Sequence, residues 1–379
     1  MIAFNLVGTK KDSGTKTFNV NFFKEINHFD KDEDVIVFIS KFYLPNKNLK
    51  LPNKMKIIVK PNLFDNFVIR FIWMQFFLPF ELKKKNVKVL FSSSNYSPFL
   101  LKFTKIESVL YVHTVLPWLF FDLMPGNKIK NFFIKKIMEI SISKSKLIIV
   151  PSEYAKINLI KKLNIKKEKI KVINLGVDHI STQKNSNEEL TNFNYNEKYI
   201  LSVISCVKYH NILNLLRSYK KFLKETKSKV KFVIVLTVLD KQYFNTLNKF
   251  VKNNFSKNQI IFLSNLENKY LPNIYKSCSL YLFTSYSETF GLTPLEAMHF
   301  NVPLLLSRTS SIDEINGDIP KYFDPDNIDE IKNKLIEIIE LKKDHKSDFN
   351  VNKKKQHLKK YLWKNTFNKT YEILVTLVI

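Results

Sequence analysis

Cysteine, glycine and acidic residues are scarce in this chain of 379 residues. Two cysteines are too few for a disulfide framework, and they fit a reducing compartment. No His/Cys cluster has the spacing of a metal site, so we expect neither a bound metal nor a separate cofactor. With six glycines in the whole chain, a glycine in a strand-to-helix loop is expected to have a backbone role there.

Long apolar runs are also missing. The nearest candidate for a membrane span, Phe67 to Phe80, is interrupted by Arg70, Gln75 and Pro79, so we expect no transmembrane helix. The N-terminus has no basic segment followed by an apolar run and a cleavage site, which argues against a secretory signal. We therefore predict a cytoplasmic protein.

Basic residues far outnumber acidic ones. Sixty-one Lys and Arg face thirty-four Asp and Glu, a net charge of +27. This excess fits an anionic partner, such as a phospholipid surface or a phosphorylated metabolite; without a nucleic-acid-binding motif in the sequence, we expect no nucleic-acid partner. A second explanation is compositional, because Lys, Asn, Ile and Phe are all abundant, as in proteins from AT-rich genomes. The residues alone leave both explanations open.

Short apolar, β-branched runs alternate with longer amphipathic stretches along the chain. Strands that alternate with helices predict parallel sheets built from βαβ units. The predicted strands include Val35–Ile39, Leu147–Val150, Ile200–Ile204, Phe232–Leu236 and Leu280–Phe283. The predicted helices include Lys128–Ser143, Glu153–Leu163, Asn211–Lys224, Lys241–Asn253 and Ile328–Leu341, with Ser152, Asp240 and Asp326 as N-caps.

An Asn-rich polar stretch, residues 179–198, separates two such halves and is predicted to be a linker. We predict an α/β fold in which two Rossmann-like domains, residues 1–178 and 199–355, face each other across a cleft. Residues 356–379 are predicted to form a C-terminal helix that returns toward the first domain. Ligands of open α/β sheets bind at the carboxyl ends of the strands, so we expect the site at those ends.

One segment, residues 285–298, carries the clearest chemical signal. It follows the predicted strand Leu280–Phe283 and leads into a helix through Gly291. The start of a helix presents free N–H groups and the positive end of its dipole, which suits a diphosphate. Two carboxylates, Glu288 and Glu296, flank this loop, and carboxylates accept hydrogen bonds from neighbouring sugar hydroxyls.

The same glutamates also have a structural explanation. Thr293 and Glu296 have the spacing of a capping box, with Pro294 at the first helical position. Glu288 fits a solvated loop carboxylate. Spacing alone leaves the structural and the functional explanation open.

The segment resembles the E-x7-E signature of retaining glycosyltransferases with the GT-B fold, family 4 in particular. The resemblance implies that Glu288 binds hydroxyls of the transferred sugar. It implies that Glu296 holds the ribose diol of a nucleotide. It also implies that the backbone at Phe290, Gly291 and Leu292 cradles the diphosphate.

Weaker similarities lie nearer the N-terminus. The segment Tyr111-Val112-His113-Thr114 resembles the strand end where the family usually has His-Asp, which implies a catalytic role for His113 facing the donor sugar. The alternative for His113 is a satisfied histidine at a strand end. Ser13-Gly14 resembles the glycine loop that approaches the donor phosphates, which makes Gly14 a candidate donor-binding residue.

One departure from the family pattern concerns its two phosphate-binding cations. Ser205 stands where the family commonly has Arg, and His210 stands where it has Lys. A phosphate clamp benefits from fixed positive charge, and an unperturbed histidine is mostly neutral near pH 7. Either Lys208 or a protonated His210 takes over this role, or donor binding is weak and the chain is a degenerate homologue.

The resemblance as a whole implies a metal-independent transferase. It would move a hexosyl-type sugar from a nucleotide-diphosphate-sugar to a hydroxyl of a glycan or lipid-linked acceptor, with retention, in cell-envelope polysaccharide or lipopolysaccharide biosynthesis. Because no carboxylate nucleophile is evident, the leaving phosphate is expected to assist deprotonation of the acceptor. The alternatives are a nucleotide-sugar epimerase on the same fold and a non-catalytic homologue that binds nucleotide or glycan.

Aromatic residues gather between positions 63 and 82 and are followed by Lys83, Lys84 and Lys85. Apolar rings beside a basic cluster suit shallow docking on an anionic membrane. An ordinary core helix that ends in a solvated charge run explains the same pattern. A second basic aromatic stretch, residues 118–136, favours the membrane, and we expect a peripheral position at the inner face of the cytoplasmic membrane.

Overall fold

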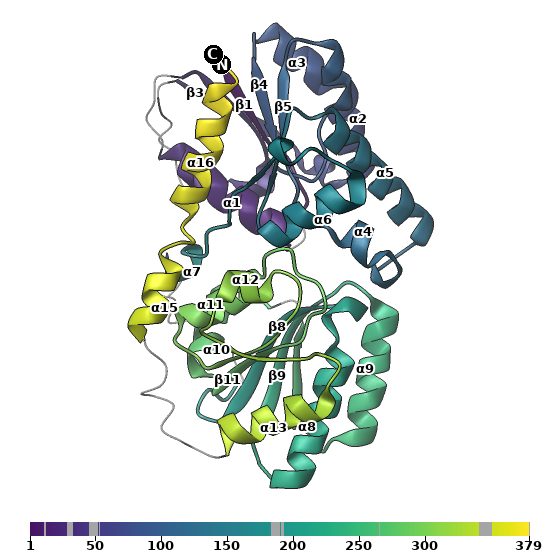
Figure 1. Ribbon diagram of the computed structural model, residues 1–379, viewed down its shortest axis with the longest axis vertical. Coiled ribbons are helices and arrows are strands. Elements are labelled where there is room, and N and C mark those ends of the chain that lie inside the picture. Colours follow the sequence, from purple (N-terminus) through teal and green to yellow (C-terminus); the bar gives the residue numbers. More distant parts are fainter. Residues whose placement is uncertain are drawn as a thin grey trace. The chain divides into compact units, whose positions relative to one another are not determined.

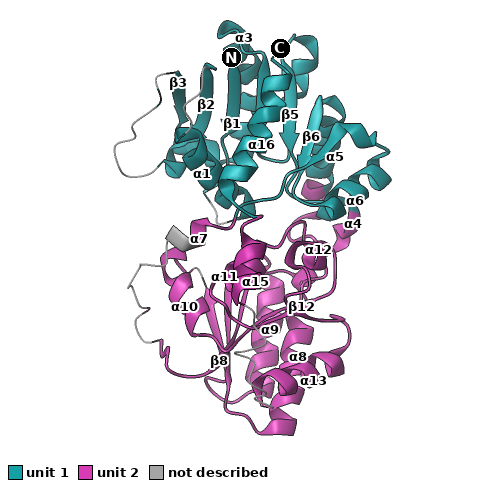
Figure 2. Cartoon of the chain, turned by 60° about the vertical axis from the view of Figure 1, so that its left-hand side comes forward, with its two compact units in different colours: residues 1–118, 132–176, 361–379 teal, residues 119–131, 177–360 magenta. Residues whose placement is uncertain are grey.

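The computed structural model describes residues 1–10, 13–28, 33–44, 52, 54–182, 190, 193–264, 266–340 and 351–378. The chain divides into two compact units, which Figure 2 shows in different colours. Unit 1 comprises residues 1–118, 132–176 and 361–379, and unit 2 comprises residues 119–131 and 177–360. Each unit contains a parallel β-sheet with helices packed on it, as the alternating sequence pattern predicts.

The described part of unit 1 holds a seven-stranded sheet in the order β3-β2-β1-β4-β5-β6-β7, parallel throughout. The inner strands β1, β2 and β4 are buried on both faces, which is why they read as nearly continuous hydrophobic runs, whereas the edge strands β3 and β7 are partly exposed. The strands are β1 Ile2–Leu6, β2 Val35–Ser40, β3 Met55–Lys60, β4 Val89–Ser92, β5 Glu107–Tyr111, β6 Leu147–Val150 and β7 Ile170–Val172.

Helices cover both faces of this sheet (Figure 1). On one face α1 packs against α16, and the rings of Phe18, Phe22, Phe91 and Phe367 meet between them and the sheet. On the other face Trp73, Met74, Leu78 and Leu82 share a core cluster with strand residues. The helical segments that lie wholly or mainly in unit 1 are α1 Gly14–Asn27, α2 Phe67–Ile72, the π-helical turn η3 Trp73–Phe77, α3 Leu78–Lys84, η4 Phe99–Phe103, α4 Leu116–Leu119, α5 Lys128–Lys144, α6 Glu153–Leu163 and α16 Trp363–Thr376.

The C-terminal helix α16 belongs to unit 1. Its first residue, Trp363, packs against the backbone of Gly176, where a Cβ would lie 2.2 Å from the Trp363 nitrogen. Only glycine permits so close an approach. Thr366 donates a hydrogen bond to the carbonyl of Asn174, at 2.8 Å, and fixes the same contact.

The described part of unit 2 holds a six-stranded parallel sheet in the order β10-β9-β8-β11-β12-β13. The strands are β8 Tyr199–Cys206, β9 Lys231–Val238, β10 Ile260–Ser264, β11 Leu280–Phe283, β12 Leu304–Ser307 and β13 Lys321–Phe323. The helical segments are α7 His179–Thr182, the 3₁₀ turn η7 Lys208–His210, α8 Ile212–Thr226, α9 Lys241–Asn254, α10 Leu271–Ser277, α11 Leu292–His299, α12 Ile312–Asn316, α13 Ile328–Ile339 and α15 Val351–Leu358.

The strand order of each sheet reverses direction at one place. The reversal lies between β1 and β4 in unit 1 and between β8 and β11 in unit 2. Such a switch point is where the loops at the carboxyl ends of open α/β sheets leave room for a ligand. In unit 2 these are the loops that follow Cys206 and Phe283.

Several predicted boundaries agree with the structure. The predictions for Leu147–Val150, Glu153–Leu163 and Leu280–Phe283 match β6, α6 and β11. The caps at Ser152 and Asp240 are confirmed, because their side chains accept hydrogen bonds from Ala155 and Tyr243 nitrogens.

The predicted cap at Asp326 is wrong. Asn327 caps α13, since its side chain accepts a hydrogen bond from the Glu330 nitrogen. Asp326 instead accepts a hydrogen bond from the Tyr286 hydroxyl. No helix within the described residues has the length and apolar character needed to cross a membrane. Of the predicted linker, residues 183–189 and 191–192 lie outside the described residues.

Candidate active site

The loop from β11 to α11 turns through Gly291. This residue has φ 83° and ψ 72°, in the left-handed region that favours glycine, and it is the N-cap of α11. A Cβ there would lie 2.8 Å from the Cδ1 atom of Ile312. Phe290 precedes it and is buried. The first N–H groups of a helix have no partner within the helix, so this turn places the start of α11 at the switch point of the sheet.

Glu288 is held by the loop between β12 and α12. Its backbone nitrogen donates to the Ser310 hydroxyl at 2.8 Å, and its carbonyl accepts from the Ser311 hydroxyl at 3.0 Å. The carboxylate is therefore presented by a fixed backbone. Its side chain is 21% exposed, which contradicts the alternative of a freely solvated loop carboxylate.

His210 lies beside Glu288, with Nε2 3.2 Å from Glu288 Oε1. The other ring nitrogen, Nδ1, is 2.7 Å from the carbonyl oxygen of Ser205. A carbonyl only accepts, so Nδ1 carries a proton and donates to Ser205. Nε2 faces the Glu288 carboxylate within ion-pairing distance, at the position where the family pattern has Lys.

Two hydrogen bonds to backbone carbonyls connect the loop after β8 with the loop after β11. The Thr284 hydroxyl donates to the His210 carbonyl at 3.0 Å, and the Tyr286 nitrogen donates to the Tyr209 carbonyl at 2.8 Å. The loops after β8 and β11 therefore form one connected structure. Lys208, at the start of η7, is exposed, and none of the ion pairs within the described residues involves it.

Glu296 lies inside unit 2 with two partners. The Tyr275 hydroxyl donates to Oε2 at 3.0 Å, and His179 Nε2 is 3.2 Å from Oε1. Burial raises the pKa of Tyr275 well above its usual value, so its hydroxyl stays protonated and acts as the donor. The side chain is 10% exposed, and both carboxylate oxygens face hydrogen-bonding groups.

The capping-box explanation of Glu296 is wrong. Because Gly291 starts the helix, Thr293 is the second residue of α11 and Pro294 the third. The hydroxyl of Thr293 lies 2.8 Å from the Tyr281 hydroxyl, not at a helix-capping position. The left-handed residue Gly291 starts the helix earlier in the sequence than the capping box predicts. The side chain of Glu296 therefore faces α7 and α10 instead of the helix start.

His179 and Tyr275 are site residues that sequence reasoning missed. His179 falls in the stretch predicted to be the linker but lies in α7, and Tyr275 lies in α10. A signal existed for His179, because the chain has only seven histidines. The sequence holds no such signal for Tyr275, because it is one of sixteen tyrosines. Only the fold brings this tyrosine to Glu296.

In unit 1 His113 follows β5. Its Nε2 lies 2.6 Å from the Ser93 carbonyl, and its backbone nitrogen donates to Asn95 Oδ1 at 2.6 Å. The ring also packs edge-on against Phe18. Burial lowers the pKa of His113 to about 4, although the hydrogen bond to Ser93 opposes this change. His113 is thus neutral near pH 7, with the proton on Nε2 and an acceptor at Nδ1.

Gly14 is the first residue of α1, which Ser13 caps by accepting a hydrogen bond from the Lys16 nitrogen. A Cβ at Gly14 would meet no atom within 4 Å, so packing does not require glycine there. Gly8, which sequence reasoning passed over, is the confined one: a Cβ would lie 2.5 Å from the Tyr43 hydroxyl oxygen. Its position two residues after the end of β1 was the available signal.

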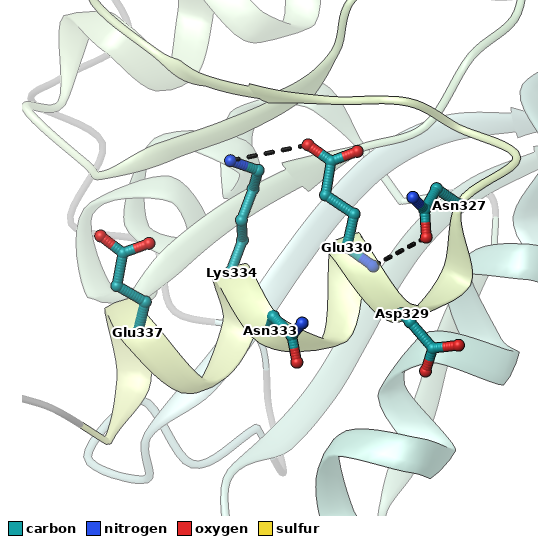
Figure 3. A pocket seen from close by; sticks show the side chains of 6 residues that line it. All are labelled: Asn327, Asp329, Glu330, Asn333, Lys334 and Glu337. Atoms are coloured by element: carbon teal, nitrogen blue, oxygen red, sulfur yellow. Dashed lines mark hydrogen bonds and ion pairs between the residues drawn. The ribbon is translucent and has the colours of Figure 1, made fainter.

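A surface hollow of about 390 Å³ lies along α13 (Figure 3), and none of the residues that line it is predicted for the site. In it Lys334 pairs with Glu330 at 3.6 Å, and a dashed line marks this pair in the figure. Asp329, Glu330 and Glu337 make its lining predominantly acidic, which disfavours a diphosphate. Within the described residues no group of three or more His, Cys, Asp or Glu side chains is arranged to hold a metal ion.

The fold is that of the GT-B glycosyltransferases. Along 99% of its length the chain is similar to 99% of the Anabaena protein HepE, whose structure was determined in complex with UDP, with a TM-score of 0.69 at 13% identity. Two adjacent family models match the sequence: Glycosyltransferase Family 4 at residues 30–180 and Glycosyl transferases group 1 at residues 183–356. The chain belongs to the family 4-like glycosyltransferases of the GT-B fold.

Curated relatives share part of the sequence. The chain is 26% identical to the serotype-specific mannosyltransferase WbdA of Escherichia coli over 236 residues, which are 60% of this chain and 28% of WbdA. It is 24% identical to the O-antigen chain mannosyltransferase B of Escherichia coli over 215 residues, 55% of each chain. The chain thus spans between about a quarter and about half of the length of these relatives.

Proposed function

We propose that this protein is a retaining glycosyltransferase that moves a hexosyl-type sugar from a nucleotide-diphosphate-sugar to a hydroxyl of a glycan or lipid-linked acceptor. It acts in the biosynthesis of a cell-envelope polysaccharide or lipopolysaccharide. The observation that carries this proposal is the arrangement at the switch point of unit 2, where Glu288, His210 and the left-handed start of α11 meet. The similarity to the mannosyltransferases WbdA and O-antigen chain mannosyltransferase B supports it and makes mannose the first sugar to test.

The diphosphate binds at the start of α11 in this proposal. Backbone N–H groups at Phe290, Gly291 and Leu292 and the helix dipole supply fixed positive potential there. Lys208 and the His210 imidazolium supply the cationic charge that the missing Arg and Lys provide elsewhere in the family. The UDP bound to HepE supports a nucleoside diphosphate as the ligand.

The two glutamates bind the neutral parts of the donor. Glu288 accepts hydrogen bonds from hydroxyls of the transferred sugar, and His210 fixes the orientation of its carboxylate. Glu296 accepts from the ribose diol with the lone pairs that Tyr275 and His179 leave unused, because each carboxylate oxygen has two. Gly14 and His113 are retained as candidates for donor binding and catalysis in unit 1.

The transfer itself follows from these charges. Two charged species need stabilisation, the departing diphosphate and the oxocarbenium-like sugar. The groups around Gly291 stabilise the diphosphate, and Glu288 stabilises the sugar. The leaving phosphate oxygen takes the proton of the acceptor hydroxyl on the same face, which gives retention. We propose that neither a metal nor a cofactor takes part.

A non-catalytic nucleotide-binding homologue is the second candidate. The observation that favours it is the pairing of Glu288 with His210, since a carboxylate held by an imidazolium is a weaker acceptor for sugar hydroxyls. An epimerase on the same fold would act on the donor alone. These functions differ in their need for an acceptor, which makes them separable in one assay.

A donor screen tests the proposal. UDP- and GDP-linked hexoses, mannose first, are incubated with the protein and with glycan or lipid-linked acceptors, and released nucleoside diphosphate is measured. Acceptor-dependent release supports a transferase, and the anomeric configuration of the product by NMR tests retention. A free isomerised sugar without acceptor identifies an epimerase, and nucleotide binding without any turnover identifies the non-catalytic homologue.

The proposal includes a peripheral position at the inner face of the cytoplasmic membrane, where a lipid-linked acceptor is available. The enzyme would then meet its soluble donor and its membrane-bound acceptor at one interface.

A further inference from the structure

The helical segment from α2 through α3 has two apolar faces. One face, formed by Trp73, Met74, Leu78 and Leu82, is buried in the core of unit 1. The other carries Ile69, Ile72, Phe76, Phe77 and Phe80, all of which are exposed. Phe80 is 75% exposed and Phe77 59%. A helix that is apolar all round buries both faces when it is in its working environment, so the outer face needs a partner.

Two neighbouring elements extend this outer face. The Gln75 side chain and the Ser141 hydroxyl both donate to the carbonyl of Ser97, so η3 and α5 meet at that residue. Phe71 contacts the ring of Phe99, which brings η4 to the same place. Figure 1 shows α2, α3 and α5 on the same side of the sheet. Exposed apolar side chains continue on these elements at Phe103, Phe132, Phe133 and Ile140.

We call these exposed side chains the apolar face. It consists of Ile69, Ile72, Phe76, Phe77, Phe80, Phe103, Phe132, Phe133 and Ile140. Further exposed apolar residues lie close to these elements in the sequence, at Val59, Leu63, Val68 and Ile129, whereas those at Ile157, Leu239 and Val351 are isolated. Scattered ones are ordinary, whereas a contiguous group marks a surface that binds a protein or a membrane.

Lysines surround the apolar face. Lys83 and Lys84 are exposed at the end of α3, and Lys102 and Lys105 flank Phe103, with the Lys102 ammonium 4.6 Å from its ring centre. The Lys136 ammonium is 5.7 Å from the ring centre of Phe132. Rings with ammonium groups beside them match the boundary between acyl chains and phosphate headgroups.

Acidic charge is sparse on the same elements: on α5 Glu139 pairs with Lys136 at 2.8 Å, and the α2–α3 segment is poorer still. Between Phe67 and Ile106 the sequence has a single acidic residue, Glu81. Its carboxylate faces inward, where it pairs with Lys60 at 3.0 Å and accepts from the Trp73 indole at 2.9 Å. The outward charge of this stretch is therefore positive, which favours a negatively charged bilayer over a second copy of this strongly basic chain.

We infer that the apolar face of unit 1 docks on an anionic phospholipid bilayer, with the phenylalanine rings in the headgroup and upper acyl region and the lysines on the phosphates. This inference names the partner that the proposed function needs for a lipid-linked acceptor. It stands on its own observations, because no residue of the donor site belongs to the apolar face.

Vesicle flotation of the whole chain, without donor, tests the inference. Phosphatidylcholine vesicles with and without phosphatidylglycerol are compared at about 0.1 M and about 1 M salt, where the Debye length is about 10 Å and about 3 Å. The protein is expected to float with anionic vesicles at low salt, to bind neutral vesicles poorly, and to lose much of its binding at high salt. Absence of flotation with anionic vesicles at low salt overturns the inference.

Two variants separate the contributions of the rings and the charges. Phe76→Ser combined with Phe77→Ser and Phe80→Ser is expected to lower the partition coefficient at least about tenfold. Its control is Ile157→Ser with Leu239→Ser, which replaces exposed apolar residues outside the face. Lys83→Glu with Lys84→Glu is expected to lower the partition coefficient about tenfold or more. Its control is Lys224→Glu with Lys229→Glu, which makes the same change of charge outside the face.

The folded state of each variant is checked by circular dichroism and by its melting temperature. Flotation of the phenylalanine variant at the wild-type level contradicts the inference. A different result assigns the face to a second copy of the chain. In that case the wild-type protein does not bind vesicles but self-associates with increasing concentration, and the phenylalanine variant does not self-associate. Donor binding is measured separately in solution, so failure of docking and failure of the proposed chemistry are distinguishable.

Discussion

The Nε2 atom of His210 lies 3.2 Å from Oε1 of Glu288, while its Nδ1 atom lies 2.7 Å from the Ser205 carbonyl. Two loops that follow different strands thus meet through one ring. Ser205 and His210 are also the two positions at which the chain departs from the family pattern. His210 therefore contacts both the backbone of Ser205, where the family has Arg, and the carboxylate of Glu288, which we propose binds the sugar.

His210→Lys tests whether a cation is what this position requires. If His210 faces the diphosphate, lysine supplies the same charge, and affinity for a nucleoside diphosphate stays equal or rises. His210→Ala is expected to lower that affinity about tenfold, since it removes a positive charge beside the diphosphate. Calorimetric titration measures both, with exposed His28→Ala as the control. Loss of binding in the lysine variant would mean that the position is not at the phosphates.

Glu296 is expected to matter for nucleotide binding and for stability, but not as a helix cap. Glu296→Ala leaves the Tyr275 hydroxyl without its partner in a buried place, which costs about 1–3 kcal/mol. Tyr275→Phe removes the donor and keeps the carboxylate, so it should affect nucleotide affinity less. Titration and urea unfolding of both variants measure the two effects. Unchanged nucleotide affinity in Glu296→Ala would assign this residue a structural role only.

His113 should make the protein less stable in acid. Its pKa is lowered to about 4 by burial, whereas an unfolded histidine has a pKa of about 6.5. Between these values the unfolded chain binds more protons, so the free energy of unfolding falls as pH falls from about 6.5 to about 4. The slope contributed is at most about 1.4 kcal/mol per pH unit.

Urea unfolding of wild type and His113→Gln over this pH range isolates the contribution, because the other groups titrate in both. Parallel curves would show that His113 titrates normally. Transfer activity of the same variant, at a pH where it is fully folded, tests the catalytic role inferred from the resemblance.

Lys354 produces a pH effect at the alkaline end. It is 1% exposed and donates to the Val302 carbonyl at 3.1 Å, and burial lowers its pKa to about 8. An unfolded lysine has a pKa of about 10.4. Between these values the unfolded chain again binds more protons, so stability rises with pH.

The comparison of wild type with Lys354→Met measures that effect. The stability difference between the two should shift in favour of wild type from about pH 8 to about pH 10, at no more than about 1.4 kcal/mol per unit. A difference that is constant over this range contradicts a buried, neutralisable lysine.

The sequence predicted those features that neighbouring residues determine. Leu147–Val150 and Glu153–Leu163 have correct ends because an apolar run, the Ser152 cap and the helix follow one another directly. The loop at Gly291 was found because glycine is rare and the loop follows a clear strand. Local capping chemistry and apolar patterning were sufficient there.

Features that depend on contacts between distant segments were missed or misread. The capping box predicted from Thr293 and Glu296 does not form, because the helix begins earlier, at the left-handed residue Gly291. Tyr275 and His179 reach Glu296 only through the packing of α10 and α7 on α11. Gly8 is confined by Tyr43, a residue of another loop. No local pattern contains such contacts.

The central claim is that Glu288 binds the transferred sugar. The most direct measurement compares acceptor-dependent release of nucleoside diphosphate by wild type and Glu288→Gln, with exposed Glu267→Gln as the control, while nucleotide-induced thermal stabilisation verifies that each protein is folded and binds nucleotide. The account predicts that Glu288→Gln keeps the stabilisation and loses transfer, whereas the control keeps both. Wild-type transfer by Glu288→Gln would contradict it.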